Sequence, residues 1–198
     1  MTRLVLWRHG RTEWNVRARY QGQTDIPLDE TGIAQARRAA GLLASLRPDV
    51  IVSSDLRRAA ATAAELAAIV GLPVIYDKNL RERYGGSWEG LTLEEIRSRY
   101  PDEFARWEPP DGATPDGDTD EMVADRVGPV LERAVGQLNQ GGLAVVVSHV
   151  GAIRLGIGRL LGMTPQQWRV IGPLGNGSWS VLELGRNGWR LLEHNARG

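Results

Sequence analysis

Short apolar runs alternate with longer amphipathic segments in the first half of the chain. Residues 4–7 form an apolar run that stops at charge and glycine, which is the pattern of a buried strand. Residues 31–47 then carry apolar side chains at helical spacing, Pro48 ends this helix, and a second apolar run follows at residues 50–54. This order of strand, helix and strand is typical of a parallel sheet with helices packed on it.

The alternation continues beyond the second apolar run. We expect Asp55 to cap a helix over residues 56–70, which Gly71 ends ahead of a third short strand at residues 74–76. The repeated exchange of strand and helix favours a largely parallel sheet over an antiparallel one.

Turn and loop signals dominate the middle of the chain. Thr92 and Glu95 have the spacing of a capping box and open a short helix that Pro101 ends. Residues 108–120 are rich in proline, glycine and acidic side chains, so we expect a surface loop there. Such a loop serves either as a lid over an active site or as a plain connector.

Regular structure returns in the last third of the chain. Asp118 and Glu121 are candidate caps for a helix that runs to about Leu138 with Pro129 inside it. Residues 143–147 form a fully apolar run, which predicts another buried strand. Two strands flank the Asn-Gly turn near the C-terminus, and we expect this hairpin to close one edge of the sheet.

The pattern as a whole predicts an α/β fold. A central, mostly parallel sheet would form the middle layer of a three-layer sandwich flanked by helices. The chain has 198 residues, 42% of them hydrophobic, and shows no repeat or linker that would divide it. We therefore expect a single domain over residues 1–198.

Composition narrows the chemistry that is open to this fold. Lysine and arginine number 24, as do aspartate and glutamate, so no overall charge draws the chain onto nucleic acid or an anionic membrane. The absence of cysteine excludes disulfides, thiolate zinc sites and a cysteine nucleophile. No apolar run approaches the ~18 residues of a membrane span, and we expect a cytoplasmic protein.

Two of the three histidines follow predicted strands directly. His9 comes after the first apolar run and His149 after the run at residues 143–147. Ligands of open α/β sheets bind beyond the carboxyl ends of parallel strands, so we expect both imidazoles to face one crevice. Either histidine alone would more often be a hydrogen-bonded structural residue. Their shared position favours a functional site.

Arginines beside these strand ends suit an anionic ligand. Arg8 precedes His9, and Arg57 begins a helix just after a strand, whereas we expect Arg58 to lie on a solvated helix face. The planar guanidinium makes bidentate, charge-assisted hydrogen bonds to phosphate. A neutral imidazole is a competent nucleophile near pH 7, and flanking arginines would neutralise charge on the phosphoryl oxygens.

Four segments together resemble the motifs of the histidine phosphatase superfamily, which includes the cofactor-dependent phosphoglycerate mutases. They are LVLWRHGRTEWN near the start, SSDLRRAAAT after the second strand, LRERYGGSWEGLT in the middle and VVVSHVGAIR after the late strand. The RHG tripeptide alone is a weak match. The order and spacing of all four segments, which span most of the chain, make the resemblance specific, and it implies a phosphoglycerate mutase-like fold.

The resemblance also assigns roles to individual residues. It implies that His9 becomes phosphorylated and that Glu82 is the general acid and base. The phosphate pocket that it implies is formed by Arg8, Arg57 and His149 and is lined by Asn15, Gln21 and Gly22. The family needs no metal and, for hydrolysis, no cofactor, because arginines and histidines supply the charge.

Some positions leave alternatives open. Glu89 and Glu94 lie near Glu82 in the sequence, and the choice of Glu82 rests on the family match. Val150 stands where the family often has a second glycine, and 117–119 reads Gly-Asp-Thr in place of Gly-Glu-Ser. The first change would narrow the floor of the pocket, and the second puts a loop contact in doubt.

The resemblance leaves several activities within the family. A mutase needs a basic lid and a site that excludes water, whereas residues 111–120 are acidic, so we expect a phosphatase acting on a small phosphate ester. WNVRARYQGQTDIPL, IVSSDLRRA and GNGSW are similar to segments of the actinobacterial glucosyl-3-phosphoglycerate phosphatases. The α-ribazole phosphatases and broad-specificity sugar-phosphate phosphatases share much of the same pattern.

An alternative from another class is a catalytically silent phosphate-binding scaffold on the same fold. It would lack at least one of the core groups, all of which are present in this sequence. By resemblance we also expect a homodimer, with no nucleic-acid or membrane partner.

Overall fold

The computed structural model describes residues 1–107 and 114–198 and has a six-stranded sheet of strand order β3-β2-β4-β1-β5-β6. The strands that run parallel to one another are β1 (Thr2–Arg8), β2 (Val50–Ser53), β3 (Val74–Tyr76) and β4 (Leu143–Ser148). An antiparallel hairpin completes one edge and consists of β5 (Trp179–Gly185) and β6 (Gly188–Ala196). The mostly parallel sheet predicted from the sequence is confirmed.

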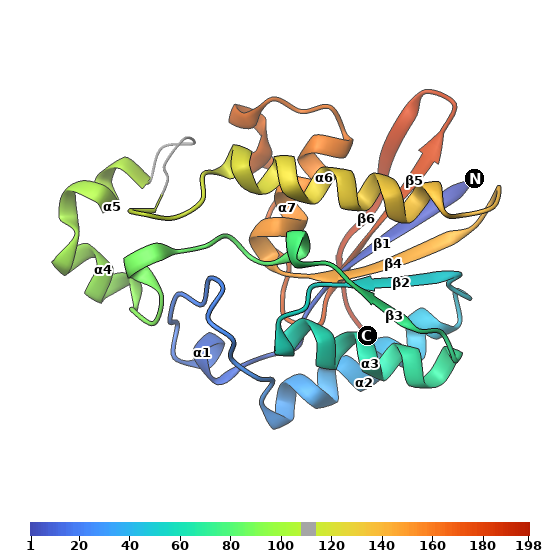
Figure 1. The fold of residues 1–198 in the computed structure, drawn as a ribbon, viewed down its shortest axis with the longest axis horizontal. Helices are drawn as coiled ribbons and strands as arrows, with labels where there is room; N and C mark the ends of the chain where they lie inside the picture. Colours follow the sequence, from blue (N-terminus) through green and yellow to red (C-terminus); the bar gives the residue numbers. More distant parts are fainter. Residues whose placement is uncertain (108–113) are drawn as a thin grey trace.

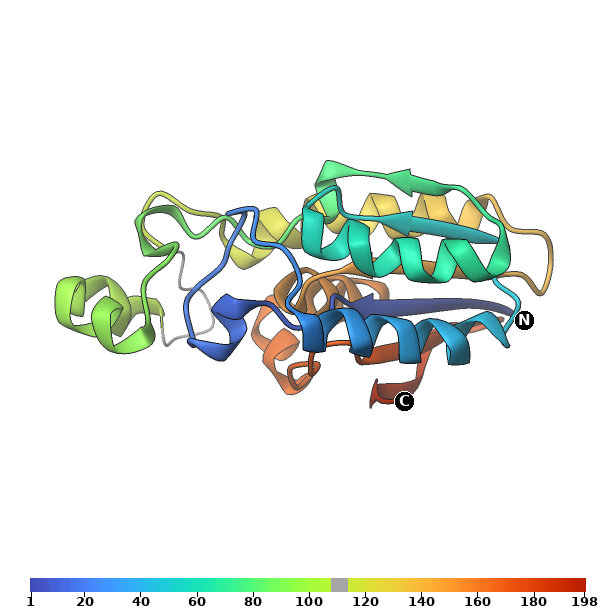
Figure 2. The same ribbon diagram turned by 90° about the horizontal axis from the view of Figure 1, so that it is seen from below.

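Helices cover both faces of this sheet (Figure 1, Figure 2). α2 (Glu30–Ala44) and α3 (Arg57–Val70) pack on one face. α6 (Asp120–Gly136) and α7 (Val150–Leu160) pack on the other. The result is the three-layer sandwich that the alternating pattern predicts.

The central strands are buried on both faces, which explains their unbroken apolar runs. In β1, Leu4 and Leu6 join the core beneath α6 and α7, whereas Val5 and Trp7 join the core beneath α2 and α3. β4 alternates in the same way. Both cores therefore contact β1 and β4, which fixes the register of these two strands from both sides.

Two of the predicted helix caps are wrong. α3 begins after Leu56 without a side-chain cap, because the Asp55 carboxylate pairs with Arg81, with 2.7 Å between Arg81 Nε and Asp55 Oδ1. α6 is capped by Thr119, whose hydroxyl accepts a backbone hydrogen bond of 3.1 Å from the first turn, and not by Asp118. In both places the expected capping carboxylate binds an arginine instead.

The middle of the chain holds one more helix than predicted. α4 (Leu93–Arg99) starts at the capping box of Thr92 and Glu95, as expected. Pro101 then begins α5 (Pro101–Trp107), because proline is well suited to the first turn of a helix. α4 and α5 lie beyond the end of the sheet in Figure 1 and pack around a separate aromatic cluster.

The remaining elements are short. They are α1 (Glu13–Val16) and the 3₁₀ helices η1 (Lys78–Leu80), η2 (Gly86–Trp88) and η3 (Pro165–Val170). The loop expected over residues 108–120 lies partly outside the described residues. Among residues 1–107 and 114–198, no helix is long and apolar enough to cross a membrane.

Candidate active site

The two histidines leave neighbouring strands at the same edge of the sheet. β1 pairs with β4 as far as Arg8 opposite Ser148, and the His9 N–H donates to the Ser148 carbonyl at 3.1 Å. The imidazole centroids of His9 and His149 are 5.1 Å apart, and both side chains are buried. The meeting of the two rings expected from their positions is therefore present.

The ring of His9 is held in one orientation. Its Nδ1 lies 2.7 Å from the Gly10 carbonyl oxygen, which can only accept, so Nδ1 carries the proton and Nε2 keeps its lone pair. The Gly10 N–H donates to Thr62 at 3.1 Å. A Cβ on Gly10 would lie 2.2 Å from the carbonyl oxygen of Gly32, so only glycine fits this close approach to α2.

Two arginines flank the histidines. The Arg8 Nη1 donates to the carbonyl of Leu174, and its buried Nε has no hydrogen-bond partner in the described part of the chain. Arg58 is fully buried, and its Nη1 and Nη2 each donate at 2.7 Å to a backbone carbonyl of residues 22–24. Its Nε lies 3.2 Å from Nδ1 of His149.

His149 is hydrogen-bonded directly to Arg58. Its Nδ1 accepts from the Arg58 Nε, so its proton sits on Nε2, which is 2.9 Å from the Ser54 hydroxyl. Both ring nitrogens are thus engaged, and His149 orients a guanidinium that lines the cavity described next.

Burial and positive charge keep both rings neutral. The pKa of His9 is held well below its usual value by burial first and then by the charges of Arg58 and Arg8. The pKa of His149 is lowered in the same way, by burial first and then by Arg58. Burial also lowers the pKa of Arg8 and of Arg58 to about 10, and Glu82 opposes this shift, so both arginines stay charged at neutral pH.

A cavity of about 390 Å³ opens beside His9. Of the residues that the sequence assigned to the site, it is lined by Arg8, His9, Asn15, Gln21, Gly22 and Glu82, whereas His149 and Arg57 do not line it. Val150, which replaces the family's usual glycine, also lines it.

The Glu82 carboxylate lies at the N-terminus of α7. Its Oε2 accepts from the Gly151 N–H at 3.0 Å, and its Oε1 accepts from the N–H groups of Ala152 at 3.2 Å and Arg83 at 2.9 Å. A Cβ at residue 151 would lie 2.4 Å from Glu82 Oε1, so glycine leaves room for the carboxylate. These three N–H groups hold the carboxyl group of Glu82 in place beside the cavity.

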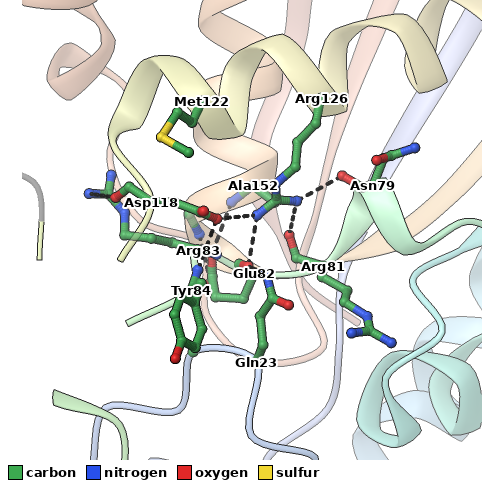
Figure 3. A network of polar contacts seen from close by, with 12 residues as sticks. Gln23, Asn79, Arg81, Glu82, Arg83, Tyr84, Asp118, Met122, Arg126 and Ala152 are labelled. Atoms are coloured by element: carbon green, nitrogen blue, oxygen red, sulfur yellow. Dashed lines mark hydrogen bonds and ion pairs between the residues drawn. The ribbon is translucent and has the colours of Figure 1, made fainter. Parts of the chain in front are cut away.

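Arg126 of α6 holds the backbone that carries Glu82 (Figure 3). Its guanidinium donates to the carbonyls of Asn79 at 2.8 Å, Arg81 at 2.6 Å and Glu82 at 2.8 Å. It also pairs with Asp118 at 3.0 Å. The Asp118 that replaces the family's usual glutamate thus anchors this network, and the segment at residues 79–82 is fixed to α6.

The prediction that Arg57 lines the site is wrong, and Arg58 lines the cavity in its place. Arg57 is exposed, does not line the cavity, and uses its backbone N–H to bind Asp25 at 2.7 Å. Arg58 shares the buried face of α3 with Thr62 and Leu66, four and eight residues further on. That helical spacing was the signal in the sequence that distinguishes the two arginines.

The alternative carboxylates have other partners. Glu89 accepts backbone hydrogen bonds from two neighbouring loops, and Glu94 is exposed on α4. Glu82 and Asp120 are the carboxylates among the described residues that line the cavity, and Asp120 is paired with Arg83. This leaves Glu82 as the candidate acid.

A second group of cavity residues was not predicted from the sequence. It includes Tyr20, Arg83, Trp107, Arg154, Trp168 and Arg169. They come from loops and helix turns far apart in the chain, so no local pattern connects them. Within residues 1–107 and 114–198, no three histidine, aspartate or glutamate side chains gather closely enough to hold a metal ion.

Comparisons with known proteins show which family the chain resembles. The model of the histidine phosphatase superfamily (branch 1) matches residues 4–197. A glucosyl-3-phosphoglycerate phosphatase of Mycolicibacterium vanbaalenii is 41% identical over 187 residues, which are 91% of this chain and 83% of that protein. Phosphoserine phosphatase 1 of Hydrogenobacter thermophilus is 37% identical over 186 residues, 93% of this chain and 87% of that protein.

A solved structure supports the same relationship. The mycobacterial glucosyl-3-phosphoglycerate phosphatase in complex with VO3 superposes with a TM-score of 0.92 at 39% identity and covers 98% of both chains.

The two neighbouring arginines of α3 allow a matched test of the corrected assignment. Arg58→Lys should weaken the binding of inorganic phosphate by about 10–100-fold, since it removes charge-assisted donors from the cavity. Arg57→Lys should change the Kd by less than about 3-fold, because that side chain lies outside it. Isothermal titration calorimetry on both variants measures this, with circular dichroism as the control for folding. Equal losses in the two variants would reject the assignment.

The lowered histidine pKa values predict how stability depends on pH. Below about pH 6.5 an unfolded histidine gains a proton that native His149 does not, so the free energy of unfolding falls as the pH is lowered. His149→Gln removes this difference, at most about 1.4 kcal/mol per pH unit. Urea unfolding at pH 7, 6 and 5 should show a shallower decline for the variant. Parallel curves would contradict a neutral buried His149.

Proposed function

The chain belongs to the histidine phosphatase superfamily, and from that premise we propose that His9 is the nucleophile of this phosphate monoester hydrolase. The observation that carries the proposal is the orientation of the ring, whose Nδ1 proton is held by the Gly10 carbonyl. Nε2 is thereby left with its lone pair, beside a cavity lined by Arg8, Arg58 and Glu82.

In the first half-reaction, His9 Nε2 attacks phosphorus as the ester P–O bond breaks. Arg8 and Arg58 bind the phosphoryl oxygens, and their charges offset the charge of the transferring group. Glu82, in its protonated form, gives its proton to the departing alkoxide. The alcohol leaves, and the phosphoryl group stays on His9.

In the second half-reaction, water takes the place of the alcohol. Glu82, now a carboxylate, accepts a proton from the water as its oxygen bonds to phosphorus. The N–P bond breaks, inorganic phosphate forms, and both His9 and Glu82 return to their starting states. In this proposal His149 is a positioning residue that orients Arg58, and Asn15, Gln21 and Gly22 shape the wall of the phosphate site.

We propose glucosyl-3-phosphoglycerate as the substrate. Support comes from the similarity to glucosyl-3-phosphoglycerate phosphatases over nearly the whole chain. A cavity of about 390 Å³ is within the range of small-metabolite sites and exceeds what phosphate alone needs. Trp107 and Trp168 line it and offer apolar surface to an organic group.

The other activities have less support. All the core groups are present in one site, which weighs against a silent scaffold. The mutase and the α-ribazole or broad sugar-phosphate phosphatase remain alternatives for the substrate test. The single domain, the homodimer and the cytoplasmic location stay predictions.

A substrate panel tests the proposed substrate. We expect kcat/KM to be highest for glucosyl-3-phosphoglycerate among a set that also holds 3-phosphoglycerate with and without bisphosphoglycerate, phosphoserine, α-ribazole phosphate and hexose phosphates. The readouts are release of inorganic phosphate and isomerisation of phosphoglycerate. A higher kcat/KM for another ester, or isomerisation faster than hydrolysis, would overturn the substrate assignment.

The role of Glu82 predicts a dependence on the leaving group. In single-turnover experiments, Glu82→Gln should slow phosphoryl transfer from an alkyl phosphate by about 10²–10⁴-fold, because the alkoxide must be protonated. Transfer from p-nitrophenyl phosphate, whose phenolate leaves unprotonated, should slow at least about tenfold less. Glu94→Gln is the matched control on an exposed site. Equal slowing of both esters by Glu82→Gln would show that the acid is misassigned.

A further inference from the structure

The cavity contains more positive charge than a phosphate monoester requires. Beyond Arg8 and Arg58 beside the histidines, four more arginines line it, namely Arg19, Arg83, Arg154 and Arg169. Two of these are neutralised within the protein, since Arg19 pairs with Glu95 at 3.1 Å and Arg83 pairs with Asp120.

Arg154 differs from these two paired arginines. In the described part of the chain no carboxylate pairs with it, and its one hydrogen bond runs from Nε to the Ile171 carbonyl at 2.8 Å. That bond orients the guanidinium of a half-buried side chain of α7 that lines the cavity, and the Nη groups form no hydrogen bond among the described residues. A guanidinium held in one orientation can present two N–H donors side by side, which match the two oxygens and the negative charge of a carboxylate.

The surroundings of Arg154 are electrostatically unfavourable without a ligand. Burial lowers its pKa, and the neighbouring charges of Arg169 and Arg83 lower it further, while Glu82 raises it. Burial is the larger of these influences, and an anion bound to Arg154 would offset its cost. The charged neighbours of Arg154 are Arg169, Glu82 and Arg83, and Arg83 is itself paired with Asp120.

The position of Arg154 along α7 relates it to the leaving group. Gly151, in the first turn, binds Glu82, which faces the ester oxygen in the proposed reaction. Arg154 is three residues further on, on the same side of the helix, and lines the same cavity. A substituent of the leaving group a few bonds beyond the ester oxygen would therefore extend past Glu82 and contact Arg154.

From this juxtaposition we propose that Arg154 binds a carboxylate on the leaving group and makes the enzyme selective for phosphate esters of hydroxy acids. The proposal rests on the proposed function and deepens it. In a 3-phosphoglycerate unit, the carboxylate is separated from the ester oxygen by two carbon atoms, which suits the short step from Glu82 to Arg154.

A matched pair of esters isolates the carboxylate. 3-Phosphoglycerate and glycerol 3-phosphate differ only in that one carries a carboxylate where the other carries a hydroxymethyl group. For the wild type, kcat/KM should be at least about tenfold higher for 3-phosphoglycerate. Arg154→Gln should bring this ratio close to one, a fall of at least about tenfold, mainly through a higher KM for 3-phosphoglycerate, which is the usual effect of losing a charged hydrogen bond. Arg154→Lys, which keeps the charge but loses the fork, should retain part of the ratio.

Arg159→Gln serves as the control on the same helix. Arg159 is exposed and pairs with Asp125 at 3.0 Å, away from the cavity, so this variant should keep the wild-type ratio. The ratio of two efficiencies is unaffected by a general loss of folded enzyme, which a purely structural role for Arg154 would cause.

The possible outcomes distinguish a failure of the carboxylate subsite from a failure of the proposed function. An equal fall in both efficiencies in Arg154→Gln, no change in their ratio, or a wild type without preference would overturn the carboxylate subsite alone. If the wild type released phosphate from neither ester nor from any ester of the panel, the proposed function itself would fail.

Discussion

The parallel pairing of β1 with β4 is the constraint on which the site depends. It ends with Arg8 opposite Ser148, so the next residue of each strand is a histidine, and the two rings leave the sheet side by side. Because both strands are buried on two faces, a slip in register would disrupt both cores at once. The energy that maintains the fold therefore also maintains the geometry of the histidines.

Burial has opposite consequences for the two kinds of cationic group in the site. It keeps the imidazoles neutral, so that Nε2 of His9 retains its lone pair, yet it leaves the guanidiniums charged because their pKa values remain about 10. The charge of Arg58 is met by backbone carbonyls, by His149 and by the field of Glu82, whereas the buried Nε of Arg8 finds no partner in the described residues. A phosphate dianion, bound as we propose, would supply what these groups lack.

Much of this structure was predictable because it depends on local patterns. The apolar runs and helical spacing gave the sheet and its layers, and the strand ends gave the meeting of His9 with His149. The choice between Arg57 and Arg58 failed because both follow the strand and only the helical period separates them. The network of Arg126 and the place of Arg154 could not be foreseen, since each depends on contacts between segments that are distant in sequence and share no motif.

Trapping a phosphorylated enzyme tests whether His9 is the nucleophile. Rapid acid-free quenching of the enzyme with a radiolabelled phosphate ester should give a phosphoenzyme whose label is stable to base and labile to acid, and peptide mapping should locate it on His9. His9→Ala should carry no label. Release of phosphate with no labelled enzyme, or a label on another residue, would contradict the account.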